Sequence, residues 1–184
     1  LTGPGMPTFA FTTGRLMLAI ALLMVAPLAW GQRQAPEPEL KAAIPANMLL
    51  FVDWPAQGTR SAQHLKLCYL DVGPVSVALS RLDGTLLKGK PLQVLQVDAA
   101  QVGSCHALYV SPDQLAEIPR AAVVARAHGV FLMGDLPGNL QRGVMLNLEL
   151  DRGRVVFDID LRSVRQAGLA VSSKALRLAR QVQE

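Results

Sequence analysis

The sequence predicts an α/β protein with a central, largely parallel sheet flanked by helices, a C-terminal β-hairpin and a terminal amphipathic helix. Two observations carry this expectation. Between residues 65 and 133, short apolar runs and helical segments follow in the order strand, helix, strand, strand, helix, strand. This order indicates crossover connections between parallel strands. After residue 143 the pattern changes to period 2 on both sides of a glycine turn, which is typical of a hairpin.

Near the N-terminus the chain has the pattern of an export signal. Arg15 precedes an apolar run that ends at Ala26, and small residues up to Gly31 fit a cleavage site. The run is short for a membrane span, which needs about 20 apolar residues. We therefore expect residues 1–31 to hold a cleaved signal peptide and the residues before it. The alternatives are an uncleaved N-terminal anchor and a buried helix.

Residues 32–38 are predicted to be a polar linker, because Pro36 and Pro38 disfavour a regular helix. The folded domain is then expected over 39–184. Pro45 either kinks a longer first helix or starts a shorter one. The residues that recur at helical spacing in this first segment are Leu40, Ala43, Ile44, Asn47, Met48, Phe51 and Val52.

The middle of the chain supplies the predicted sheet. Apolar runs predict buried strands at 65–70, 92–97, 106–111 and 129–133, and helical segments at 75–82 and 112–126. Ser111 is the expected N-cap of the second helix, with Pro112 at its first position and Pro119 breaking it.

In the C-terminal third, alternating residues predict hairpin strands over 144–150 and 155–161, joined by a turn at Asp151–Arg154. A short helix over 161–167 is expected to end at Gly168. Ser172 or Ser173 then caps the predicted terminal helix. Its apolar stripe is Ala175, Leu178, Ala179 and Val182, and its basic face is Lys174, Arg177 and Arg180.

The chain has two cysteines, Cys68 and Cys105. In an oxidising compartment two cysteines predict one disulfide, and the alternative is two buried free thiols. A bridge would close a loop of about 37 residues, for which the chain-entropy model gives ~4 kcal/mol. A metal site is disfavoured, because Cys105 and His106 are adjacent and no CxxC or HExxH motif is present.

Composition and motifs narrow the function. The net charge of +4 is mild, aromatic residues make up 5% of the chain and no Lys/Arg stripe occurs. These features argue against a nucleic-acid-binding role. No P-loop, nucleophile elbow or GxGxxG motif is present. We therefore expect a non-enzymatic protein without catalytic residues, cofactor or metal.

Several residues carry a second interpretation. Glu149, Asp158 and Asp160 could form paired carboxylates, but a solvated sheet face is the simpler reading. The loop from Asp135 to Gly138, with Asn139, follows a strand and is either an ordinary turn or a ligand site. Trp54 either packs at the core boundary or contacts a partner, and the basic face of the last helix either aids solubility or meets an acidic partner. The three histidines, expected to be structural or surface residues, are His64, His106 and His128.

The chain resembles the YfiR family of small periplasmic proteins over nearly all of the expected mature domain. No single motif is specific, but the order and spacing of several stretches match together. These stretches are Leu40–Ala43, Phe51–Pro55, Leu65–Leu70, Leu87–Leu92, Cys105–Ser111, Gly143–Leu148, Gly153–Ile159 and Ala167–Ala179.

The resemblance implies a central sheet flanked by helices and a disulfide between Cys68 and Cys105. It also implies a periplasmic protein that represses a membrane-bound diguanylate cyclase by binding its periplasmic sensor domain, and it allows a homodimer. The chain departs from the family in lacking a second cysteine pair near the hairpin and in having Pro45 in its first helix. No nucleic acid partner and no stable membrane insertion after signal cleavage are expected. The candidate partner-binding residues are Trp54, Lys174, Arg177 and Arg180. A periplasmic small-ligand-binding or sensory module is the alternative function.

Overall fold

The computed structural model describes Gly3, residues 35–54 and residues 63–184. The predicted signal peptide lies outside the described residues apart from Gly3, and so does the first part of the predicted linker. The chain divides into two units between Gln34 and Ala35, and the fold below is that of the second unit. Within the described part of the chain, no helix is both long enough and apolar enough to cross a membrane.

Helices and short strands alternate along this unit. In chain order the elements are α2 (Glu37–Met48), β1 (Val52–Asp53), β2 (Leu65–Tyr69), α3 (Pro74–Ser80), β3 (Leu86–Leu87), β4 (Lys90–Gln96), η1 (Ala99–Ser104), β5 (Ala107–Val110), η2 (Pro112–Glu117), α4 (Ile118–His128), β6 (Phe131–Gly134), η3 (Leu140–Arg142), β7 (Leu146–Asp151), β8 (Arg154–Asp160), α5 (Leu161–Gln166), β9 (Ala170–Val171), α6 (Ser173–Leu176) and β10 (Gln181–Gln183).

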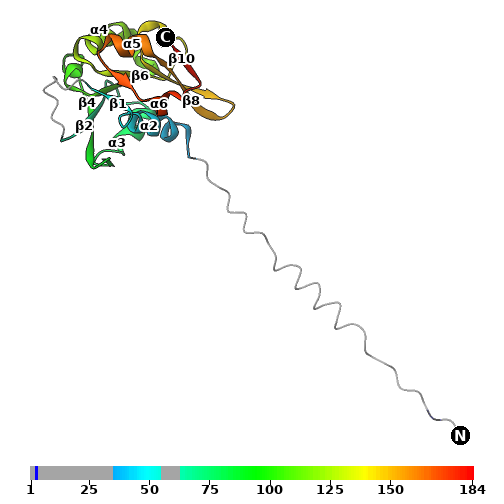
Figure 1. Ribbon diagram of the computed structural model, residues 1–184. Coiled ribbons are helices and arrows are strands. Elements are labelled where there is room, and N and C mark those ends of the chain that lie inside the picture. The colour runs from blue at the N-terminus through cyan, green and yellow to red at the C-terminus, as the bar shows by residue number, and fades with distance from the viewer. Residues whose placement is uncertain (1–2, 4–34, 55–62) are drawn as a thin grey trace. The chain divides into compact units, whose positions relative to one another are not determined.

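Among the described residues, eight strands form one sheet in the order β10-β8-β7-β6-β5-β2-β4-β3 (Figure 1). Strands β4, β2, β5, β6 and β7 run parallel to one another, whereas β8 is antiparallel to β7 and β3 is antiparallel to β4. At the far edge β10 runs parallel to β8. A separate antiparallel pair joins β1 to β9, with Val52 opposite Val171. The predicted fold class is therefore confirmed.

The path of the chain reverses direction between β2 and β5. From β2 the chain passes through α3 to β4 on one side, and it then returns to β5 on the other side of β2. From β5 it continues through α4 to β6. Because such crossovers are right-handed, oppositely directed ones place their helices on opposite faces of the sheet. Figure 1 shows α4 and α3 on opposite sides accordingly.

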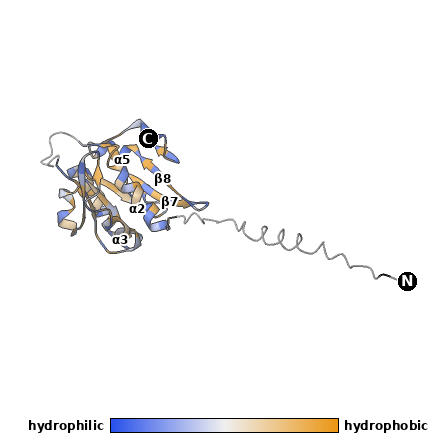
Figure 2. Ribbon diagram, turned by 90° about the horizontal axis from the view of Figure 1, so that it is seen from below, coloured by the Kyte–Doolittle hydropathy of each residue, from blue (hydrophilic) through white to orange (hydrophobic). Residues whose placement is uncertain are grey.

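The core is built mainly from the parallel strands. The most hydrophobic stretches of the ribbon run along the sheet in Figure 2. All residues of β5 and β6 are buried, as expected for strands covered on both faces. The predicted hairpin and the helix before Gly168 are both present, and Gly168 has the positive φ of 70° that a helix C-terminus favours.

Helix α2 differs from the prediction in its start and in its buried face. It begins at Glu37 and includes Pro38, so the helix reaches into the predicted linker. Proline is tolerated there because the first N–H groups of a helix have no intrahelical acceptor. Pro45 lies inside the helix. Helix α2 packs chiefly against α3, and its buried residues are Ala42, Pro45, Ala46 and Met48, of which only Met48 belongs to the predicted stripe.

The expected cap of the segment after β5 is also different. Ser111 stands at the N-cap position of η2, but its side chain makes no cap bond there and its hydroxyl instead donates to the Asp71 carboxylate at 2.8 Å. The break predicted at Pro119 occurs one residue earlier, where η2 ends and α4 begins at Ile118.

The predicted terminal helix is replaced by one helical turn and a strand. Helix α6 ends at Leu176, and β10 then pairs with β8, with Val182 opposite Ile159. Leu178, a member of the predicted apolar stripe, is 70% exposed. Hydrogen bonding to the free edge of β8 competes with continuation of the helix, and local periodicity does not reveal that long-range pairing.

Candidate functional site

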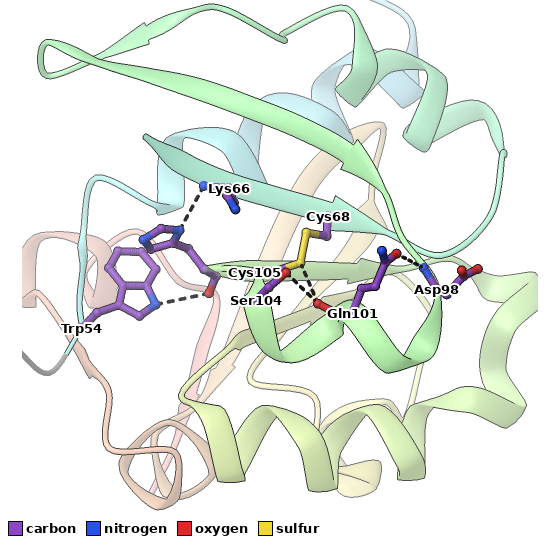
Figure 3. The surroundings of a disulfide bond; sticks show 8 residues. Trp54, Lys66, Cys68, Asp98, Gln101, Ser104 and Cys105 are labelled. Carbon is purple, nitrogen blue, oxygen red and sulfur yellow. Dashed lines mark hydrogen bonds between the residues drawn. A yellow bond between two sulfur atoms is a disulfide. The ribbon is translucent and has the colours of Figure 1, made fainter. Parts of the chain in front are cut away.

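The disulfide lies at the centre of the sheet. Cys68 is in β2 and Cys105 lies two residues before the start of β5, and the two strands are neighbours (Figure 3). Their Cα atoms are 6.1 Å apart and the bridge closes a sequence separation of 37 residues. Both residues are fully buried. The structure thus agrees with the expected bridge, and its position indicates a structural role, because solvent does not reach the sulfur atoms.

Trp54 packs beside His106, close to the disulfide (Figure 3). The two rings meet edge to face with centroids 5.4 Å apart, and the indole N–H donates to the His106 carbonyl at 3.2 Å. The imidazole Nδ1 accepts the backbone N–H of Lys66 at 3.0 Å. His106 is therefore a buried structural residue. Trp54 is half-buried, and its indole N–H is bonded within the protein. Its contact with a partner stays a prediction, and only the exposed part of the side chain could make it.

Arg180 pairs with carboxylates of the hairpin. Its Nε donates to Asp158 at 2.9 Å, its Nη2 contacts both Asp158 and Glu149, and the Glu149 contact is 2.6 Å. These bonds, chiefly those to Asp158, raise the pKa of Arg180 above its ordinary value despite some desolvation. We call Arg180, Glu149 and Asp158 the arginine cluster. Both carboxylates bond to the same guanidinium, so the cluster holds one positive and two negative charges.

The other two basic candidates, Lys174 and Arg177, are exposed around α6. They do not share one helical face with Arg180, because the helix ends before that residue. Their contact with a partner remains a prediction for the surface next to β9.

The acidic residues of the hairpin do not form a catalytic pair. Asp158 is buried against Arg180 rather than solvated, which corrects the expectation of a solvated face at this position. Asp160 caps α5 by accepting the Arg162 N–H at 2.9 Å and the Ser163 hydroxyl at 2.6 Å. Glu149 and Asp158 thus share Arg180, and Asp160 bonds to the start of α5.

A cavity of about 340 Å³ lies at the carboxyl ends of β2, β5 and β6. These parallel strands end at the same edge of the sheet, and the chain reverses direction between β2 and β5. Open α/β sheets bind ligands outside the carboxyl ends of strands at such a reversal. The lining residues come from the N-terminal part of α2, from the end of β5 and from the segments that follow the strands. They are Glu37, Pro38, Lys41, Gly73, Pro74, Val75, Ser76, Tyr109, Ser111, Pro112, Asp113 and Asp135.

Lys41 connects α2 to the end of β6. Its ammonium group lies 2.8 Å from Glu37 Oε1 and 3.1 Å from Asp135 Oδ2. Burial opposes the charge, but the two carboxylates outweigh it and raise the pKa of Lys41. The Lys41 side chain is 13% exposed and that of Asp135 is 4% exposed, so this pair is well shielded from solvent.

Three residues that line the cavity each have a buried oxygen atom without a hydrogen-bond partner. These atoms are the Tyr109 hydroxyl, the Ser76 hydroxyl and Asp135 Oδ1. Tyr109 and Ser76 are each 1% exposed and Asp135 is 8% exposed. Burial raises the pKa of Tyr109, and the nearby Asp135 carboxylate raises it further although the hydroxyl forms no hydrogen bond of ordinary geometry. Buried polar atoms are usually paired, so this group is exceptional.

The loop after β6 contributes to the cavity only through its first residue. Asp135 lines the cavity, whereas the residues from Leu136 to Asn139 do not. Leu136 instead donates its N–H to Asn147 at 3.2 Å. His64 and His128 are exposed and do not line the cavity.

Sequence reasoning selected Asp135 but missed Lys41, Ser76 and Tyr109. Polar residues directly after strand ends gave a usable signal, since Asp71, Ser111 and Asp135 each follow a parallel strand. No local signal marks the others. Lys41 belongs to a distant helix, and Tyr109 reads as an ordinary strand residue. In the described residues, no three His, Cys, Asp or Glu side chains are grouped closely enough to hold a metal ion.

The family model described as YfiR/HmsC-like matches residues 38–180. This chain belongs to the YfiR/HmsC-like family. The family is one of periplasmic regulators, and the match spans almost the whole described unit. The comparison with curated proteins finds no match.

One solved structure shares the fold at low sequence identity, and a second is similar to a lesser degree. A conserved domain protein from Vibrio cholerae O1 biovar El Tor strain N16961 is 15% identical with a TM-score of 0.51, and the match covers 80% of this chain and 60% of that one. An ABC domain in complex with L-Trp from Streptococcus pneumoniae is 10% identical with a TM-score of 0.47, covering 79% and 60%. This chain thus aligns with about 60% of each of these chains.

Proposed function

We propose that this protein is a periplasmic, non-enzymatic regulator that represses an inner-membrane diguanylate cyclase by binding its periplasmic sensor domain. The observation that carries the proposal is membership of a regulator family over residues 38–180. The export pattern before Gln32 supports the compartment. The buried disulfide suits an oxidising environment, where such bonds persist.

Repression by binding requires a preference for one conformation of the sensor domain. A regulator that binds the inactive conformation more tightly shifts the population towards it, and the shift cannot exceed that difference in affinity. The surface we assign to this contact is the exposed pair Lys174 and Arg177, with the exposed part of Trp54. An acidic patch on the sensor domain would complement it.

Cellular cyclic di-GMP tests the function. We expect its level to rise when the gene is deleted and to return when the exported protein is restored, but not when a form lacking residues 1–31 is supplied. The double variant Lys174→Glu/Arg177→Glu should fold normally and fail to restore repression. The matched variant Arg152→Glu/Arg154→Glu reverses two exposed charges at the hairpin turn and should restore it. An unchanged cyclic di-GMP level on deletion would contradict the proposal.

We also infer a second function, that of a small-ligand-binding or sensory module. The cavity at the carboxyl ends of β2, β5 and β6 favours it, because about 340 Å³ is within the range of small-molecule sites. Binding of a small molecule to the purified protein is the test. This second function can accompany repression, since the cavity and the pair Lys174 and Arg177 use different residues.

A further inference from the structure

We propose that this cavity binds a small organic cation through a primary ammonium group. The proposal rests on the ligand-binding function inferred above and is independent of cyclase repression. The deciding observation is the combination of an acidic lining with three buried oxygen atoms that lack partners, Asp135 Oδ1 and the hydroxyls of Ser76 and Tyr109.

The charge of the lining selects the sign of the ligand. Three carboxylates, those of Glu37, Asp113 and Asp135, line the cavity together with a single cation, Lys41. Lys41 is already bonded to Glu37 and Asp135, and Asp113 remains exposed at the rim. An anion entering the cavity would therefore meet an excess of negative charge, whereas a cation would reduce it.

The unpartnered oxygens select the kind of cation. A primary ammonium group has three donors and no acceptor. Asp135 Oδ1 and the two hydroxyl oxygens are all able to accept, so one ammonium group offers a donor for each. A metal ion is a poorer fit, because the described residues hold no suitable group of three His, Cys, Asp or Glu ligands.

The rest of the lining accommodates a short carbon chain. Prolines 38, 74 and 112 and the side chain of Val75 contribute apolar surface. Pro38 comes from α2, Pro74 and Val75 from α3, and Pro112 from η2, so the apolar groups come from separate elements around the cavity. A small amine with an alkyl body would contact these groups while its ammonium end reaches the buried oxygens.

Isothermal titration calorimetry on the purified full chain tests the charge preference. The probes are 1,4-diaminobutane, the neutral isostere 1,4-butanediol, the dianion succinate and magnesium chloride, at pH 7 and 0.15 M ionic strength to screen surface attraction. We expect saturable binding of the diamine to one site and none of the other three. Equal binding of the diol, or binding of succinate or magnesium in place of the diamine, would overturn the proposal.

Variants locate the site. Asp135→Asn and Ser76→Ala should each weaken diamine binding, the first by about tenfold or more because a bond to a charged group is lost. Asp113→Asn, at the exposed rim, should weaken it less and serves if Asp135→Asn fails to fold. Asp151→Asn removes an exposed carboxylate at the hairpin turn and should change nothing. Equal diamine affinity in all the folded variants would place binding elsewhere and refute the site.

Discussion

The arginine cluster and the ion pairs of Lys41 at the cavity each join one basic residue to two carboxylates, yet only the arginine cluster leaves no carboxylate oxygen without a partner. Arg180 contacts both oxygens of Asp158 and one oxygen of Glu149, and the other oxygen of Glu149 accepts the Asn147 amide at 3.3 Å. Lys41 reaches only one oxygen of Asp135 and leaves the other buried without a donor. A guanidinium fork saturates carboxylates where a point ammonium does not. Similar composition therefore produces a structural tie in one place and an open site in the other.

The largest effect is expected from removal of the disulfide, which supports the cavity and not the arginine cluster. The variant Cys68→Ala/Cys105→Ala should lose about 2–4 kcal/mol of the free energy of unfolding, because the bridge restricts the unfolded chain. Urea denaturation of the oxidised protein and of the variant measures the difference. Since β2 and β5 frame the cavity, diamine binding should also weaken in the variant. Equal stability would contradict the structural role that we assign to the bridge.

Removal of Arg180 should leave the carboxylates of the arginine cluster without their cation and so destabilise the fold. Arg180→Met leaves Asp158, which is 5% exposed, without its cation, and we expect a loss of about 2 kcal/mol after allowance for the exposed arginine. Chemical denaturation gives the value. Arg180→Lys keeps the charge but not the fork, so it should recover only part of the loss. Full recovery of stability in Arg180→Lys would contradict the idea that a guanidinium fork is needed to pair both carboxylates.

Removal of Lys41 should cost less, about 1–2 kcal/mol, because its carboxylates lie beside an open cavity. The control is Lys174→Met, which removes an exposed ammonium group and should change the free energy of unfolding little. The pKa of Lys41 is raised in the folded state, so its contribution is complete below the unfolded value of about 10.4 and is lost as pH rises through the folded value. The melting temperatures of the wild type and of Lys41→Met should therefore converge above the folded pKa of Lys41.

The smallest effect is expected at Tyr109. Its buried hydroxyl has no partner, so Tyr109→Phe should change stability by less than about 1 kcal/mol in either direction. The raised pKa of Tyr109 adds a pH effect with a defined sign. The wild type should lose stability relative to Tyr109→Phe as pH rises above about 10, where the unfolded phenol ionises. Tyr69→Phe is the control, and a large loss for Tyr109→Phe at neutral pH would show that the hydroxyl is bonded.

Local sequence patterns predicted the elements whose signals lie within a short stretch of the chain. The buried strands, the hairpin and the helix ended by Gly168 follow from apolar runs and turn residues that are close in sequence. The terminal helix failed because Val182 fits a helical stripe as well as it fits a strand, and only the distant partner Ile159 decides between them. The prediction for Arg180 was wrong for the same reason. It was expected on one helical face with Lys174 and Arg177, whereas it pairs with Glu149 and Asp158 of the hairpin.

The cavity was predictable in position but not in composition. Its place directly after a predicted strand pointed to the loop that begins with Asp135. The residues that give the cavity its character come from α2 and from the interior face of β5, and no spacing rule connects Lys41 or Tyr109 to that loop. Tertiary packing alone brings them together.

The short pairing of β1 with β9 joins the two proposed binding regions. Helix α2, which holds Lys41, leads through β1 to β9, and β9 leads directly to α6 with Lys174. The Ser172 N–H also donates to the Phe51 carbonyl at 2.8 Å. If a cavity ligand shifts α2 and this pairing carries the shift to α6, the ligand and the partner change each other's affinity by the same factor.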